Sequence, residues 1–152
     1  MQHRRTGVYS REQLSRLLHP ASIAVVGAST RAGSFGERVI FNMKHYAGRS
    51  FPVNARYQTI GDQTCYPNIA DLPEVPDCAV ITAPREAVEE IVLDCARAGV
   101  GGAIIFASGY AETGKEDRAV QQERLAAIAR ETGLRIVGPN CIGVVNALLD
   151  SR

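Results

Sequence analysis

The stretch IAVVGASTRAGSFGERV, residues 23–39, decides the fold. It begins as a short apolar run, which is typical of a strand buried on both faces. The run then breaks into the small residues Gly27, Ala28 and Ser29, and the sequence resumes as a helix at about residue 35. A buried strand followed by a tight turn and a helix is the first unit of an α/β sheet.

The turn in this stretch has the character of an anion site. Glycine and alanine let a backbone approach a ligand closely, because little side chain stands in the way. The N–H groups and the dipole at the start of the next helix favour a negative charge. We therefore predict a phosphate-binding turn that includes Gly27, Ala28 and Gly36. The alternative is a plain strand-to-helix turn.

The glycine spacing excludes the two common phosphate fingerprints. A dinucleotide site has G-x-G-x-x-G, but Gly27 is followed by Ala28 and Ser29, and the next glycines are Gly33 and Gly36. A mononucleotide loop has G-x-x-x-x-G-K-[ST], but the interval from Gly27 to Gly33 is one residue too long and no lysine follows.

The end of the second predicted strand gives a further test. NAD-binding domains place an acidic residue there, which binds the ribose hydroxyls. This chain has FPVNARY at residues 51–57, with Arg56 and no acid. An arginine suits a phosphate on the ribose, which indicates NADP or coenzyme A; a solvated surface cation is the alternative reading of Arg56.

Composition sets the broad class. A chain of 152 residues fits one domain and buries about 68–70% of its unfolded surface. The net charge is +1 with both signs interspersed, which argues against a nucleic-acid or membrane surface. The opening MQHRR is basic, but no apolar run follows it, so we expect no secretory signal and a cytoplasmic location.

The cysteines and histidines indicate no metal site. The four cysteines are far apart, without a C-x-x-C pair, and the three histidines are not clustered. Cys78 and Cys95 fall on apolar faces, where we expect unreactive core thiols. Cys141 lies in a loop near the predicted site, either as a buried or spacer cysteine or as a thiol of the reaction chamber. Glu112 lies in another loop near the site, either as a loop or helix-cap carboxylate or as a catalytic acid.

Alternating elements predict the architecture. Ser10 caps a helix whose leucines Leu14, Leu17 and Leu18 share a face, which we expect to pack on the sheet edge. Predicted strands cover 22–27, 50–54, 77–82, 103–107 and 134–137. Predicted helices cover 35–47, the segment between Pro84 and Gly99, and 115–131; residues 55–76 form an extended piece and one helical turn. The fold class is α/β: a single-domain, Rossmann-like, doubly wound parallel sheet of about five strands.

Several motifs together make the chain similar to a known family over residues 9–147. It resembles the coenzyme A-binding domain of NDP-forming acyl-CoA synthetases, which are relatives of the succinyl-CoA synthetase alpha subunit. The motifs, in order, are VGAS at 26–29 with Gly33 and Gly36, PVN at 52–54 with Arg56, CYP at 65–67 with IADLP at 69–73, Ala83-Pro84, SGY at 108–110 with Glu112, and GPNC at 138–141.

The resemblance implies a set of site residues. Those expected around the phosphates and nucleotide of coenzyme A are Ser29, Gly33, Ser34, Phe35, Val53, Asn54 and Arg56. Those expected to wall the ligand or flank its pantetheine arm are Thr82, Ala83, Pro84, Phe106, Ala107 and Ser108. The family usually has lysine at position 56 and proline at position 55, and a proline or aliphatic residue at position 82; this chain has Arg56, Ala55 and Thr82.

The resemblance also implies a larger enzyme. The family joins a carboxylic acid to coenzyme A at the expense of a nucleoside triphosphate, through an acyl-phosphate and a phosphohistidine. Its histidine and its ATP-grasp domain lie downstream or in a partner chain, so this segment is expected not to catalyse the ligation alone. We expect residues 1–8 to be a disordered leader and 148–152 to begin a linker. A stand-alone coenzyme A-binding or regulatory protein and an NADP-binding reductase domain are the alternatives, and homo-oligomerisation and the acid are left open.

Overall fold

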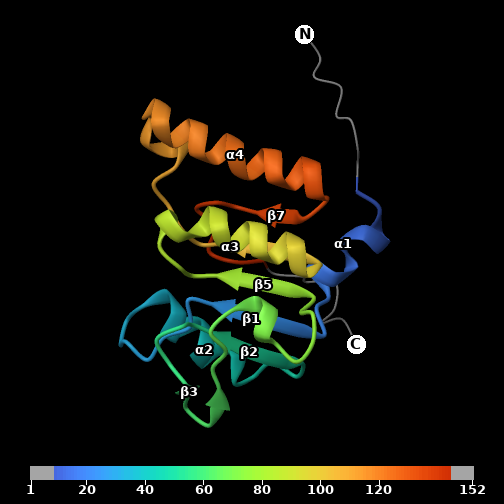
Figure 1. The fold of residues 1–152 in the computed structure, drawn as a ribbon, viewed down its shortest axis with the longest axis vertical. Coiled ribbons are helices and arrows are strands. Elements are labelled where there is room, and N and C mark those ends of the chain that lie inside the picture. Colours follow the sequence, from blue (N-terminus) through green and yellow to red (C-terminus); the bar gives the residue numbers. More distant parts are fainter. Residues whose placement is uncertain (1–8, 145–152) are drawn as a thin grey trace.

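The computed structural model describes residues 9–144, which form one parallel sheet with helices on both faces (Figure 1). The strands, in sheet order, are β2 (Arg49–Val53), β1 (Ser22–Val26), β5 (Cys78–Ile81), β6 (Gly102–Ile105) and β7 (Arg135–Val137). All neighbouring pairs are parallel, so the predicted doubly wound, Rossmann-like sheet is confirmed. The predicted leader at 1–8 and the predicted linker at 148–152 lie outside the described residues.

The central strands are buried on both faces, as the apolar run at residues 23–26 predicts. Successive side chains of a strand point to opposite faces. In β1, Ala24 and Val26 join one core cluster, whereas Ile23 and Val25 join the other. Helices α3 (Arg85–Ala98) and α4 (Glu116–Thr132) cover the first face, and α2 (Phe35–Met43) packs on the second.

Helix α1 (Arg11–Leu18) begins at the predicted cap but packs elsewhere than predicted. The Ser10 hydroxyl accepts the N–H of Gln13, and the Gln13 side chain accepts the N–H of Ser10. The helix lies across the ends where the strands begin, not along the sheet edge (Figure 1), and Leu17 contacts Gly102 there. Leu18 is 37% exposed, because a short helix in this position buries little more than one side chain.

Helix α2 is shorter than the predicted span of 35–47. It ends at Met43, because the next N–H groups bond to carbonyls three residues back instead of four. Lys44, His45 and Tyr46 each make such a bond, to Phe41, Asn42 and Met43 respectively. The tighter turns therefore end the α-helix four residues before the predicted boundary.

The connection from β2 to β5 contains a hairpin that the sequence analysis did not predict. Strands β3 (Thr59–Ile60) and β4 (Gln63–Thr64) pair in antiparallel fashion around Gly61, whose φ is 62°. The predicted single helical turn is confirmed as a 3-10 helix, η1 (Ile69–Asp71).

Residues of this connection also bond to the outer side of β2. The N–H of Tyr66 donates to the carbonyl of Pro52, and the N–H of Asn54 donates to the carbonyl of Tyr66. The Gln63 amide donates to the carbonyl of Ser50. Together these bonds hold the connection against the edge strand.

Candidate functional site

The sheet has one topological switch point. From β1 the chain passes to β2 on one side and then returns to β5 on the other, so the loops that follow β1 and β5 diverge. Open α/β sheets bind ligands in the crevice outside the carboxyl ends of the strands at such a point. A cavity of about 580 Å³ opens there, between the loops after β1, β2 and β5 and the start of α2 and α3.

Most of the residues predicted from the sequence line this cavity. They come from three loops that are far apart in the chain: Gly27, Ser29, Ser34, Phe35, Gly36, Val53, Asn54, Arg56, Thr82, Ala83 and Pro84. The loops meet because parallel strands present their carboxyl ends at the same edge of a sheet.

The remaining predicted residues do not line the cavity: Ala28, Gly33, Phe106, Ala107 and Ser108. Ala28 is fully buried beneath it, in the core. Phe106 adjoins it, because its ring meets the ring of Phe35 edge-on at 5.8 Å between centroids. Gly33 and Ser108 are exposed in their loops, and the carbonyl of Ala107 accepts the N–H of Asn140.

Close packing explains the small residues in the loop after β1. Gly27 has a φ of 93°, and a Cβ there would lie 2.7 Å from the nitrogen of Ala83. A Cβ on Gly36 would lie 2.1 Å from the carbonyl oxygen of Gly27. The first turn of α2 is thus pressed directly onto the loop, with no room for a side chain between them.

The start of α2 supplies N–H groups to the cavity. The first-turn N–H groups of a helix have no acceptor within the helix. The Ser34 hydroxyl accepts the N–H of Glu37, while Phe35 and Gly36 line the cavity. With the positive end of the helix dipole, these N–H groups make an environment that favours an anion.

Two side-chain links join the loop after β1 to the loop after β2. The Asn54 amide donates to the carbonyl of Ala28 at 2.8 Å and accepts the N–H of Arg56 at 2.9 Å. The Tyr57 hydroxyl lies 3.4 Å from the Ser29 hydroxyl. Within residues 9–144, Arg56 forms no ion pair, so its charge is free to meet a ligand.

The sequence analysis missed several residues of the cavity lining: Val26, Arg31, Ala55, Tyr57, Pro67, Ala87 and Ile91. Tyr57 could have been found, because it directly follows Arg56. Ala87 and Ile91 lie one turn apart on α3, and their apolar spacing marks a helix face without showing that part of it borders a cavity.

The loop after β6 is organised by Glu112. Its carboxylate accepts the N–H of Gly109 at 2.6 Å and the N–H of Tyr110 at 3.1 Å. The hydrogen bond from Gly109 lowers the pKa of Glu112, so this carboxyl stays charged at neutral pH. Of its two predicted roles, the contacts match the loop cap. Cys141 lies outside the cavity, where its sulfur accepts the N–H of Gly143.

Two further thiols belong to the core, as predicted. Cys78 and Cys95 are buried, and burial raises the pKa of each to about 12. Across residues 9–144, no three His, Cys, Asp or Glu side chains come together in a way that could hold a metal ion. Over the same residues, no helix is long and apolar enough to cross a membrane.

Comparison with known proteins identifies relatives over most of the chain. The acetate–CoA ligase [ADP-forming] II of Archaeoglobus fulgidus is 39% identical over 140 residues, which are 91% of this chain and 21% of the relative. The trans-feruloyl-CoA synthase FCS1 of an unknown prokaryotic organism is 41% identical over the same length and is covered to 20%. The chain therefore spans about a fifth of the length of these two relatives.

Solved structures give the same picture. PH0766 from Pyrococcus horikoshii OT3 superposes with a TM-score of 0.83 at 36% identity, covering 90% of this chain and 32% of that one. The dinucleotide forming acetyl-coenzyme A synthetase 1 of Ca. Korarchaeum cryptofilum, in complex with phosphate and ADP, gives 0.79 at 36% identity, covering 86% and 28%. Residues 21–147 match the model of the CoA binding domain, and the chain belongs to this family of coenzyme A-binding domains.

Proposed function

We propose that the cavity at the carboxyl edge of the sheet binds coenzyme A. One observation carries this assignment: the start of α2 and the cation Arg56, which forms no ion pair within residues 9–144, line the same cavity at the switch point. Coenzyme A has a diphosphate and a ribose phosphate at one end and a neutral arm at the other. A site for it needs two separate anion-binding regions next to a less polar channel.

The residues divide into roles that match this ligand. The N–H groups of Phe35 and Gly36 and the helix dipole would hold the diphosphate. Arg56 would pair with the ribose phosphate, as an arginine does with phosphate oxygens. Thr82 and Pro84 would form a wall, and the apolar surface of Phe35 and Phe106 would lead the pantetheine arm past Ala107 and Ser108.

We infer further that the chain is one domain of an NDP-forming acyl-CoA synthetase. In the reaction, a carboxylic acid, coenzyme A and a nucleoside triphosphate give an acyl-CoA, a nucleoside diphosphate and phosphate. This domain would hold coenzyme A and would not catalyse the ligation by itself. The phosphohistidine and the ATP-grasp domain would belong to the same chain or to a partner. The names of the curated relatives, several of which are ADP-forming ligases, support this role. A cytoplasmic location remains a prediction.

A thermal-shift titration with coenzyme A, dephospho-coenzyme A, NADPH and NADH tests the proposed ligand. At 100 times its dissociation constant a ligand adds about 2.7 kcal/mol of stability. For a domain of this size the midpoint rises by roughly 5–10 °C. We expect this rise with coenzyme A and a smaller one with the dephospho form. A shift with NADPH and none with coenzyme A would favour a reductase domain instead.

A further inference from the structure

We propose that the hydroxyl pair of Ser29 and Tyr57 is a further ligand-binding element of this cavity. It donates one O–H to the phosphate on the ribose and so favours coenzyme A over dephospho-coenzyme A. The inference rests on the proposed function, because it names the part of coenzyme A that the pair would read.

The two hydroxyls come from different loops and meet at the cavity. Ser29 follows β1 and Tyr57 follows β2, and both line the cavity. Their oxygens lie 3.4 Å apart, and the Ser29 oxygen also accepts the N–H of Arg31 at 3.0 Å. The pair is therefore held from both loops before any ligand arrives.

A count of protons shows what the pair can offer. Two hydroxyls carry two protons, and one hydrogen bond between them uses one of these protons. Whichever hydroxyl donates, the other keeps a proton that it can give to a third group. A phosphate oxygen is a suitable third group, because it only accepts hydrogen bonds and carries negative charge.

The surroundings make Tyr57 well suited to donate to the phosphate. Hydrogen bonds from Ser29 and then from Thr30 lower the pKa of Tyr57, and the positive charge of Arg56 acts in the same direction. A more acidic phenol is a stronger hydrogen-bond donor.

The position of the pair selects the ribose phosphate rather than the diphosphate. The start of α2, which also lines the cavity, would already hold the diphosphate. Tyr57 directly follows Arg56, and the Asn54 amide fixes the N–H of Arg56 while bonding to the carbonyl of Ala28. The cation and the phenol are thus held by the same loop, at the position where related folds read the ribose.

Calorimetric titration of Tyr57→Phe tests the proposal, with coenzyme A, dephospho-coenzyme A and adenosine 3′,5′-bisphosphate as ligands. The substitution removes one oxygen and keeps the ring. We expect about tenfold weaker binding of the two ligands with a 3′-phosphate and less than about twofold change for the dephospho form. Ser29→Ala should give the same selectivity, and the double variant should lose little more than either single one, because the two act as a pair.

Tyr66→Phe is the matched control, since Tyr66 lies in the same connection but does not line the cavity. It should bind all three ligands like the wild type. Unchanged binding in Tyr57→Phe would overturn the inference, as would an equal loss for coenzyme A and its dephospho form. A wild-type chain that does not bind coenzyme A would overturn the proposed function and this inference with it, whereas the first two outcomes leave the proposed function standing.

Discussion

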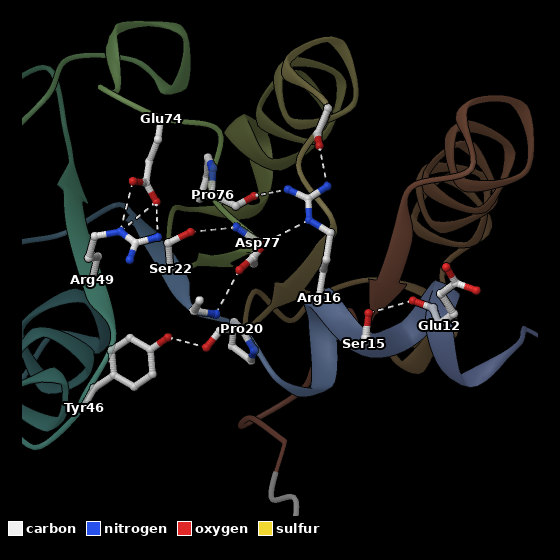
Figure 2. Close-up of polar contacts among 12 residues, drawn as sticks. Glu12, Ser15, Arg16, Pro20, Ser22, Tyr46, Arg49, Glu74, Pro76 and Asp77 are labelled. Carbon is white, nitrogen blue, oxygen red and sulfur yellow. Dashed lines mark hydrogen bonds and ion pairs between the residues drawn. The ribbon is translucent and has the colours of Figure 1, made fainter.

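The two ends of the sheet differ in how their polar groups are used. At the amino end, side chains bond to one another: Asp77 lies between the loop at Ala21 and the guanidinium of Arg16 (Figure 2). At the carboxyl end, the first turn of α2 and the cation Arg56 face a cavity. The difference teaches that one end holds the fold together through ion pairs and hydrogen bonds, while the other places N–H groups of α2 and the charge of Arg56 at a cavity.

At the amino end, Arg16 and Asp77 form a cluster in which each side chain bonds to more than one partner. Arg16 donates to the Asp77 carboxylate at 2.8 Å and to the carbonyls of Gly99 and Pro76. The other Asp77 oxygen accepts the N–H of Ala21 at 2.8 Å. Figure 2 shows that these contacts join α1 to the start of β1 and β5. Substitutions in this cluster should therefore alter stability and leave binding intact. Substitutions at the carboxyl end should alter binding, either alone or together with stability.

Gly36→Ala should have the largest effect, because it should lower both the stability of the domain and its affinity for coenzyme A. Its Cβ would collide with the carbonyl of Gly27, and backbone cannot swing aside as a side chain can. We expect a loss of about 3 kcal/mol in the free energy of unfolding, the upper part of the range for overpacking. Binding of coenzyme A should also be lost, because α2 must move away from the loop. Urea unfolding and calorimetry measure the two effects.

Gly33→Ala is the control for this substitution. A Cβ at Gly33 meets nothing within 4 Å, although the φ of 77° strains any other residue. It should cost only about 1 kcal/mol. Equal losses from the two variants would show that backbone conformation, not close packing, explains the glycines of this loop.

Arg56→Ala should weaken coenzyme A binding by about 1.5–3 kcal/mol, the range for a hydrogen bond to a charged group. Dephospho-coenzyme A should lose less, since it lacks the phosphate that Arg56 is proposed to meet. Thermal unfolding without ligand should not change. Arg38→Ala, an exposed cation of α2 that does not line the cavity, provides the control. If both variants bind equally well, Arg56 is not in the site.

Asp77→Ala should lower the free energy of unfolding by about 1–2 kcal/mol, because it removes the acceptor of two donors. The loss is no larger because Arg16 is half-exposed, so that solvent screens its charge. The unfolding midpoint should fall by a few degrees, roughly 2–4 °C per kcal/mol for this size. Coenzyme A affinity should match that of the wild type. A large loss of binding would break the separation between the two ends of the sheet.

The pH dependence of stability should reveal the same carboxylate. Burial raises the pKa of Asp77, but the hydrogen bonds from Arg16 and Ala21 outweigh it and hold the pKa below the ordinary 3.8. A depressed pKa contributes stability that is present above the unfolded value and is lost as the pH falls through the folded one. Unfolding free energies should therefore drop from about pH 5 downward, and more steeply in the wild type than in Asp77→Asn. Parallel curves would remove Asp77 as the cause.

Glu74→Gln should have the smallest effect. The Arg49–Glu74 pair has a short distance of 2.9 Å, but its side chains are 60% and 36% exposed. Such pairs contribute little, because solvent screens them and both side chains must be ordered. The urea midpoint should stay within experimental error of the wild type at neutral pH. A clear loss would mean that this pair belongs to the same stabilising cluster as Asp77.

Most of the architecture could be predicted, because it follows from local pattern. The apolar run at 23–26 and the small residues after it specify a buried strand and a turn, whatever the rest of the chain does. The hairpin around Gly61 was missed, since strands of two residues are too short for alternation to show. The Gly61-Asp62 pair was the available turn signal. Leu17 is buried and Leu18 is not because of the position that α1 takes on the sheet, and the apolar pattern of the helix does not specify that position.

The candidate site could be predicted as a set of loops but not as a shape. Ser29, Asn54 and Thr82 each follow a strand end at the same edge of the sheet, and the strand order brings their loops together. The Ser29–Tyr57 contact depends on how the two loops fold, which spacing does not specify. For Glu112 the sequence left a loop-cap carboxylate and a catalytic acid open, and only the structure shows that backbone N–H groups already occupy its carboxylate.

The bonds along the outer side of β2 have a consequence for association between molecules. A bare edge strand is a template on which another strand can add, and repeated addition leads to aggregates. Pro52 has no N–H to offer, its carbonyl is taken by Tyr66, and the carbonyl of Ser50 is taken by Gln63. The connection therefore covers much of this side of the sheet and opposes its extension by a neighbouring chain through β2.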